Sequence, residues 1–167
     1  MDLTTTPATD DATKLDDYTR LRDALRGSAP AVVAGQPVID WGDLDAFDNN
    51  TTEATLRKGF GDPGVEVDGT LLALLAGVGG SVFLEVVARR EPGAATATCT
   101  VDLYNVTTGA QVASSAVAIS LATDNATAQK SGAITLASGV NKYRFRMKTS
   151  NAATPVAARA RLVVKGA

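Results

Sequence analysis

The stretch Val140-Asn-Lys-Tyr-Arg-Phe-Arg-Met-Lys-Thr149 alternates cationic with apolar side chains. Tyr143, Phe145 and Met147 fall on one side of an extended chain. The cationic residues on the other side are Lys142, Arg144, Arg146 and Lys148. Successive side chains of a strand point to opposite faces, so a period of two indicates one buried and one solvated face. The stretch therefore predicts a half-buried strand of an antiparallel sheet.

The same period returns at residues 96–105 and 155–165, and in the second of these Arg159 and Arg161 lie opposite the apolar side. Shorter apolar runs, separated by turns that contain Gly or Pro, predict further strands at 55–60, 65–67, 82–90, 111–121 and 134–136. Many short antiparallel strands are typical of sandwiches and barrels. We therefore predict an all-β fold, an antiparallel two-sheet β-sandwich that is jelly-roll-like, over residues 31–167.

Three segments are less regular. Residues 69–76 are rich in Leu and Ala, which favour helix, but the run is short and bounded by glycines, and we predict a strand buried on both faces. Residues 40–48 predict a solvated acidic loop anchored by Trp41 and Phe47, and residues 124–131 predict a polar loop. A calcium ion is the alternative for the acidic loop, but the spacing lacks the glycine and final glutamate of the helix–loop–helix calcium motif.

Residues 1–30 form a separate N-terminal unit in this interpretation. Residues 1–12 predict an extended arm, and a short helix begins near Thr13 and ends at Gly27. Its apolar stripe, at spacings of three and four residues, consists of Leu15, Tyr18, Leu21 and Leu25. A helix of about three turns is marginal alone in water, so we expect this stripe to dock on the sandwich or on a partner.

The net charge of the 167-residue chain is only −2, but the charges are unevenly distributed. Residues 1–80 hold fourteen acidic and six basic side chains, whereas residues 81–167 hold four acidic and ten basic ones. Such opposite charges can be satisfied within one subunit or between subunits of an assembly.

Residues suited to catalysis are scarce. The chain contains no histidine, which excludes Ser–His–Asp and Cys–His chemistry and an imidazole metal site. Its single cysteine, Cys99, lies on the apolar side of the 96–105 strand and predicts a small buried side chain. A carboxylate pair remains the one open enzymatic alternative. We expect no enzymatic activity, no cofactor, no metal and no membrane span.

The strongest electrostatic feature is the set of cations on the 140–149 strand, with Arg159 and Arg161 on the strand expected beside it. Its alternatives are an ordinary solvated face and a docking surface for an acidic partner. Nucleic acid is disfavoured because no aromatic residue interleaves with the cations, since Tyr143 and Phe145 point to the opposite face.

Three groups of segments together resemble the virion β-sandwich domains of tailed bacteriophages. They are Val101-Asp-Leu-Tyr-Asn-Val-Thr-Thr-Gly-Ala110, Ser131-Gly-Ala-Ile-Thr-Leu-Ala-Ser-Gly139, and the pair Asn141-Lys-Tyr-Arg-Phe-Arg146 with Ala158-Arg-Ala-Arg-Leu-Val-Val164. Such domains occur in capsid decoration (cement) proteins and in head and tail fibres, often as trimers.

The resemblance implies a non-enzymatic structural protein on the particle surface, made in the host cytoplasm. Its partners would be copies of itself, as a homotrimer, and the major capsid protein or another virion protein. Leu15, Tyr18, Leu21 and Leu25 and the six cations of the two strands are the expected docking residues. The alternative is a carbohydrate- or receptor-binding module of a phage fibre or spike, with a glycan as ligand.

Overall fold

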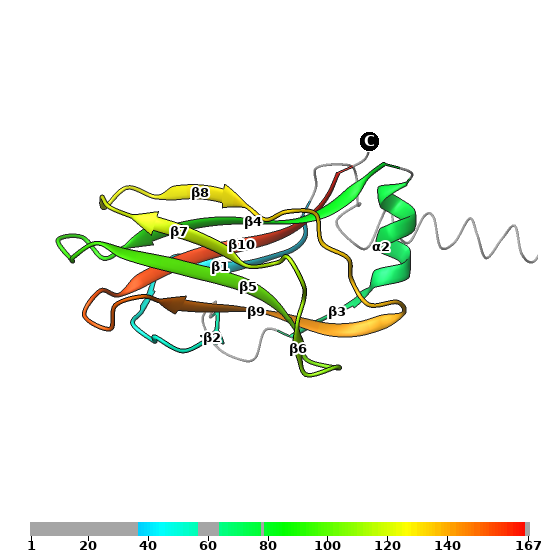
Figure 1. The fold of residues 1–167 in the computed structure, drawn as a ribbon, viewed down its shortest axis with the longest axis horizontal. Coiled ribbons are helices and arrows are strands. Elements are labelled where there is room, and N and C mark those ends of the chain that lie inside the picture. The colour runs from blue at the N-terminus through cyan, green and yellow to red at the C-terminus, as the bar shows by residue number, and fades with distance from the viewer. Residues whose placement is uncertain (1–36, 57–63, 78, 166–167) are drawn as a thin grey trace, which may run out of the picture.

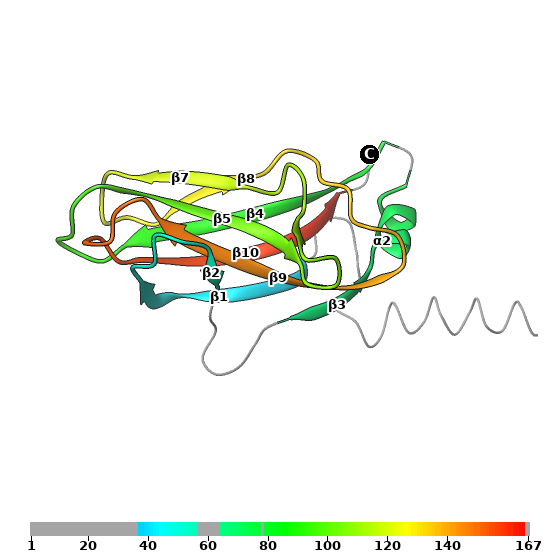
Figure 2. The same ribbon diagram turned by 60° about the horizontal axis from the view of Figure 1, so that its bottom comes forward.

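The computed structural model describes residues 37–56, 64–77 and 79–165, which form two antiparallel sheets packed face to face (Figures 1 and 2). This confirms the predicted all-β sandwich. The predicted arm and helix of residues 1–30, including Leu15, Tyr18, Leu21 and Leu25, lie outside the described residues.

The four-stranded sheet has the order β1-β10-β4-β8. Its strands are β1 (Pro37–Asp48), β10 (Val156–Lys165), β4 (Ser81–Arg90) and β8 (Thr127–Lys130). The six-stranded sheet has β9 and β5 at its centre, with β2 and β3 pairing with β9 and with β6 and β7 pairing with β5. Its strands are β2 (Ala54–Thr55), β3 (Val65–Asp68), β5 (Ala97–Asn105), β6 (Ala110–Gln111), β7 (Val117–Leu121) and β9 (Val140–Thr149).

The period of two in the sequence gives the core its inner faces. On β9 the side chains of Tyr143, Phe145 and Met147 are buried, while the cations between them are half-buried on the outer face. Phe145 lies opposite Leu103 of β5, and Leu84 and Leu162 lie opposite each other in the facing sheet. All four side chains belong to one apolar cluster between the sheets. Burial of this cluster is the main force that holds the two layers together.

Residues 69–76 are a helix, α2 (Gly69–Ala76), and the predicted strand is wrong. The carboxylate of Asp68 accepts hydrogen bonds from the backbone N–H groups of Thr70 and Leu71 at 2.9 and 3.2 Å, which caps the first turn. Leu72 and Ala76, four residues apart, are buried, as expected for one face of a helix. The helix propensity of Leu and Ala decides the conformation here, and α2 covers one end of the sandwich (Figure 1).

Residues 40–48 belong to strand β1, and the predicted acidic loop is wrong. Asp40 lies opposite Arg161, and Trp41 lies opposite Ala160. The cationic residues on β10 offset the negative charge of residues 40–48, so this acidic segment can form an edge strand. Gly42 has a φ of +105°, and a Cβ on it would lie 2.3 Å from the Ala158 carbonyl oxygen. Glycine therefore lets β1 approach β10 closely.

The remaining differences concern short elements. The predicted polar loop at 124–131 contains strand β8, and the predicted strand at 111–121 is divided into β6 and β7. Ser115 lies in the interruption, where its buried hydroxyl donates to the Val112 carbonyl at 2.7 Å and accepts from the Leu103 N–H at 3.1 Å. Residues 134–136 contribute one bridge, from Ile134 to Val82.

Candidate docking surfaces

The six cations predicted to form one surface lie on two different surfaces. Strand β9 belongs to the six-stranded sheet and β10 to the four-stranded sheet, so they are not neighbours and that prediction is wrong. The connection between them crosses the end of the sandwich. At its start the N–H of Ser150 donates to Thr98 of the six-stranded sheet, and at its end Pro155 accepts from Glu91, which follows β4. The outward side chains of the two strands therefore face in opposite directions.

On the outer face of the six-stranded sheet, Arg146 is held by Asp102. The Nε and Nη2 atoms of Arg146 donate to the two carboxylate oxygens of Asp102 at 2.8 and 2.6 Å. Asp102 is only 5% exposed, so this pair is largely shielded from water. The hydrogen bond with Asp102 raises the pKa of Arg146 above its usual value. Arg146 is thus committed to an internal contact.

A second cation of this face is also paired. Lys148 Nζ contacts Glu53 Oε1 at 2.6 Å. The hydrogen bond from Lys148 lowers the pKa of Glu53. Lys142 and Arg144 make no ion pair within the part of the chain that the structure describes.

An aromatic side chain lies among these cations, contrary to the prediction from the sequence. Tyr104 of β5 lies opposite Arg144, and the guanidinium carbons of Arg144 and Arg146 lie 5.3 and 4.3 Å from the centre of its ring. The expectation that no aromatic residue interleaves with the cations is therefore wrong. Alternation within 96–105 already places Tyr104 on the same outer side as Asp102, a signal that could have identified both residues. Tyr143 and Phe145 point into the core, as predicted.

On the outer face of the four-stranded sheet, every cation of β10 has a carboxylate partner. Arg159 donates from Nε and Nη2 to the Asp40 carboxylate at 2.8 and 2.5 Å. This hydrogen bonding raises the pKa of Arg159. The carboxylate of Glu85 on β4 forms ion pairs with both Arg161, at 3.2 Å, and Lys165, at 3.0 Å.

These contacts show how the two oppositely charged parts of the sequence meet. Asp40, Asp45 and Glu53 of the acidic part pair with Arg159, Arg89 and Lys148 of the basic part, respectively. All three pairs lie within one subunit. Of the two ways to satisfy the uneven charge, the described residues use the internal one.

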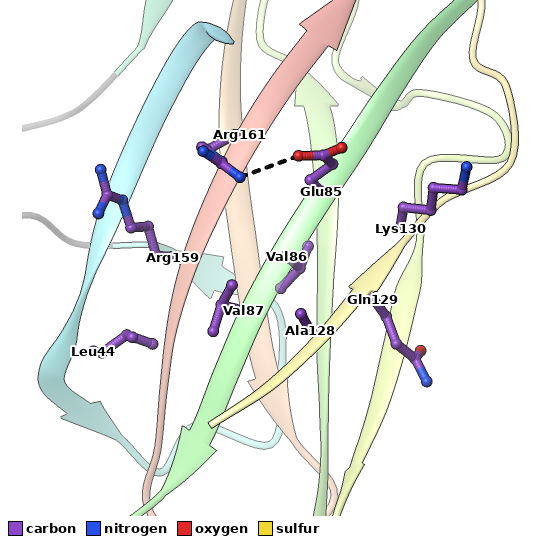
Figure 3. A pocket seen from close by; sticks show the side chains of 9 residues that line it. All are labelled: Leu44, Glu85, Val86, Val87, Ala128, Gln129, Lys130, Arg159 and Arg161. Atoms are coloured by element: carbon purple, nitrogen blue, oxygen red, sulfur yellow. Dashed lines mark hydrogen bonds and ion pairs between the residues drawn. The ribbon is translucent and has the colours of Figure 1, made fainter. Parts of the chain in front are cut away.

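A hollow of about 540 Å³ lies on the outer face of the four-stranded sheet (Figure 3). Leu44, Val87 and Ala128 supply apolar surface, and Arg161 lies beside Glu85 on neighbouring strands. The other lining residues are Val86, Gln129, Lys130 and Arg159. The hollow thus combines small apolar side chains with cationic and amide donors and one carboxylate. Ligand sites in proteins commonly combine apolar walls with a few polar groups in this way.

The described residues contain no group of three or more His, Cys, Asp or Glu side chains that could hold a metal ion. Nor do they include a helix with the length and apolar character needed to cross a membrane. Cys99 is 1% exposed, as predicted for a core residue, and burial raises the pKa of its thiol to about 12.

The buried thiol predicts a pH dependence of stability. In the unfolded chain the thiol titrates near its ordinary value of 9.0, whereas in the folded chain it stays protonated to about pH 12. The contribution of the buried thiol to the free energy of unfolding is therefore fully present below pH 9. Between pH 9 and about pH 12 this contribution is lost, by about 1.4 kcal/mol for each pH unit. Urea denaturation of the protein and of Cys99→Ala over this pH range should give diverging curves. Parallel curves would contradict the assignment.

Comparison of the chain with protein-family models, with curated proteins and with solved structures gives no match. What the protein does is therefore inferred from its own residues.

Proposed function

We propose that the protein is a non-enzymatic structural component of a bacteriophage virion, which decorates or stabilises the capsid as a homotrimer. Residues 1–30 anchor it to the major capsid protein or to another virion protein. The observation that carries this proposal is the strand order of the sandwich. The resemblance of residues 101–110, 131–139, 141–146 and 158–164 to virion sandwiches points the same way.

The strand order supports a jelly-roll type of sandwich. One sheet has the order β1-β10-β4-β8. In the sheet that faces it, β2 and β3 lie at one edge, β9 and β5 follow, and β6 and β7 lie at the other edge. The first strand and the last are therefore neighbours, and the successive connections from β7 to β8, from β8 to β9 and from β9 to β10 each pass from one sheet to the other. Double-sheet jelly rolls of this kind occur in viral capsid and lectin domains.

The ion pairs are consistent with a rigid unit of an assembly. Arg146–Asp102 and Lys148–Glu53 join strands within the six-stranded sheet or link it to the chain segment beside β2. Arg159–Asp40 joins β10 to the edge strand β1. A sandwich fixed in this way presents constant surfaces to its neighbours, and many individually modest contacts then add up to strong attachment.

Removal of residues 1–27 tests the anchoring role. The shortened protein is expected to keep the cooperative thermal unfolding of the sandwich and to lose sedimentation with purified capsids. Replacing residues 1–27 by a Gly/Ser stretch of equal length is the matched control for chain length, and it should fail to load in the same way. Unchanged loading of either variant would exclude the anchoring role.

The hollow of about 540 Å³ favours a second candidate function, a carbohydrate- or receptor-binding module. Trp41 is a poor probe of it, because its half-buried indole Nε1 donates to the Leu56 carbonyl at 3.1 Å. Ala128 is exposed and lines the hollow, so Ala128→Trp should fill it. Ala118→Trp, exposed on β7 of the other sheet, is the control. Specific binding on a glycan array that only Ala128→Trp abolishes would establish this function. An array without specific binding would exclude it.

A further inference from the structure

Two large apolar side chains of the described residues are strongly exposed, and both lie at the α2 end of the sandwich. Leu74 on α2 is 74% exposed, and Val140 at the start of β9 is 63% exposed. We propose that the predicted N-terminal helix of the same chain, residues 13–26, packs with its apolar stripe against Leu74 and Val140. This inference concerns the isolated protein and does not depend on the proposed virion role; on a particle, the same stripe would leave this contact in order to bind the capsid partner.

Hydrogen bonds place the two exposed side chains at one end. The N–H of Gly69 donates to the Gly139 carbonyl at 3.1 Å, and the N–H of Gly139 donates to Thr70 Oγ1 at 3.0 Å. Val140 directly follows Gly139, and Leu74 lies one helical turn beyond Thr70 on the same side of α2. Val140 and Leu74 therefore lie on either side of the contact between Gly139 and Thr70, where the start of β9 meets α2.

The chain enters the sandwich at this same end. Pro37, the first residue of β1, lies opposite Val163 near the end of β10. A Cβ on Gly80 would lie 1.8 Å from the Ala76 carbonyl oxygen and 2.9 Å from that of Lys165, so the last turn of α2 adjoins the end of β10. The segment that precedes Pro37 therefore starts close to the last turn of α2.

The connecting length allows the contact. Residues 27–36 form a link of ten residues between the predicted helix and β1. Fully extended, such a link spans at most about 33–36 Å, which greatly exceeds the length of an eight-residue helix, about 12 Å. A tethered segment also has a high effective concentration, commonly in the millimolar range. Both facts favour the segment of the same chain over that of a second copy.

The two surfaces match in character. Helix α2, with the sequence Gly-Thr-Leu-Leu-Ala-Leu-Leu-Ala, carries no charged side chain. The stripe on the predicted N-terminal helix likewise consists only of uncharged side chains, those of Leu15, Tyr18, Leu21 and Leu25. A predicted helix too short to be stable alone and an exposed apolar helix beside its point of attachment would stabilise each other by burying these side chains.

Engineered disulfides test the contact in the full-length chain. The native Cys99 is buried and does not compete. Leu74→Cys combined with Leu21→Cys should form an intramolecular disulfide under mild oxidation, detected as a faster-migrating monomer on a non-reducing gel. Asp23→Cys lies on the other side of the predicted helix and is the matched control. Equal yields for the two pairs, or a disulfide that forms only between chains, would overturn the proposal.

Hydrogen exchange gives an independent measurement. Leu74→Asp should increase the exchange rate of amides 13–26 by roughly tenfold, the order expected when burial of one leucine is lost. Ala152→Asp introduces the same charge on an exposed residue of the β9–β10 connection, at the opposite end of the sandwich, and should leave these amides unchanged. The same exchange rates in both variants would contradict the contact.

Discussion

Replacing Phe145 by alanine is expected to lower the free energy of unfolding by about 3–5 kcal/mol. Phe145 is 2% exposed and lies opposite the fully buried Leu103, so its removal leaves a cavity between the two sheets. Chemical denaturation monitored by circular dichroism measures the loss. Its size reflects both the lost transfer of the ring from water and the incomplete closure of the cavity.

The neighbouring outward residue is the matched control. Arg144→Ala removes a side chain of similar length from the same strand, but its guanidinium lies over Tyr104 on the outer face. A cation–π contact at such a site contributes about 0.5–1 kcal/mol. Equal losses for the two variants would contradict the alternation of β9, because a slip of one residue would exchange the inner and outer faces.

Replacing Asp102 by asparagine is expected to lower the free energy of unfolding by about 2–3 kcal/mol. The change keeps the shape of the side chain but removes the charge that receives two hydrogen bonds from Arg146. Because Asp102 is almost fully buried, water cannot replace the lost interaction. Urea denaturation at neutral pH measures this effect.

Glu53→Gln is the control on the same sheet. It breaks the Lys148–Glu53 pair, whose side chains are both well exposed. Water and salt screen such a pair, so its loss should change stability far less than the loss of Asp102. A double-mutant cycle with Arg146→Met isolates the Asp102–Arg146 coupling. If Asp102→Asn were as mild as Glu53→Gln, the pair would not hold β5 to β9.

The long strands could be predicted from the sequence because each carries its own alternation. Strand β9 has the predicted bounds, and β4, β5 and β10 differ from the predicted ranges by one residue at their N-terminal ends. Burial of one face determines both the conformation and the phase of such a strand. The confirmed part of the fold is therefore the part with a strong period of two.

The predictions for residues 69–76 and 40–48 were wrong because forces other than the period of two determine the conformation there. At α2 the helix propensity of Leu and Ala and the Asp68 cap outweighed the bounding glycines. At β1 the carboxylates looked solvated, but Arg159 on β10 and Arg89 on β4 neutralise Asp40 and Asp45. Such partners are distant in sequence, and local composition does not reveal them.

The prediction of a single docking surface was wrong for the same reason, because it depended on contacts between residues distant in sequence. The alternation of β9 and β10 correctly predicted which side chains point outward, but not that the two strands belong to different sheets. Which sheet a strand joins depends on long-range pairing rather than on its own pattern. The sequence therefore identified the cations and could place Asp102 and Tyr104 on an outer face, while the contacts of Arg146 with these two residues and of Arg161 with Glu85 required the structure.

A low-resolution map of intact particles of the phage that we propose encodes the protein tests the proposed virion role most directly. We expect sandwich-sized density on the particle surface, repeated around local threefold axes, with the end where β1 begins turned toward the shell. Particles that contain the protein only at a site without such symmetry, or that lack it altogether, would contradict the role in capsid decoration.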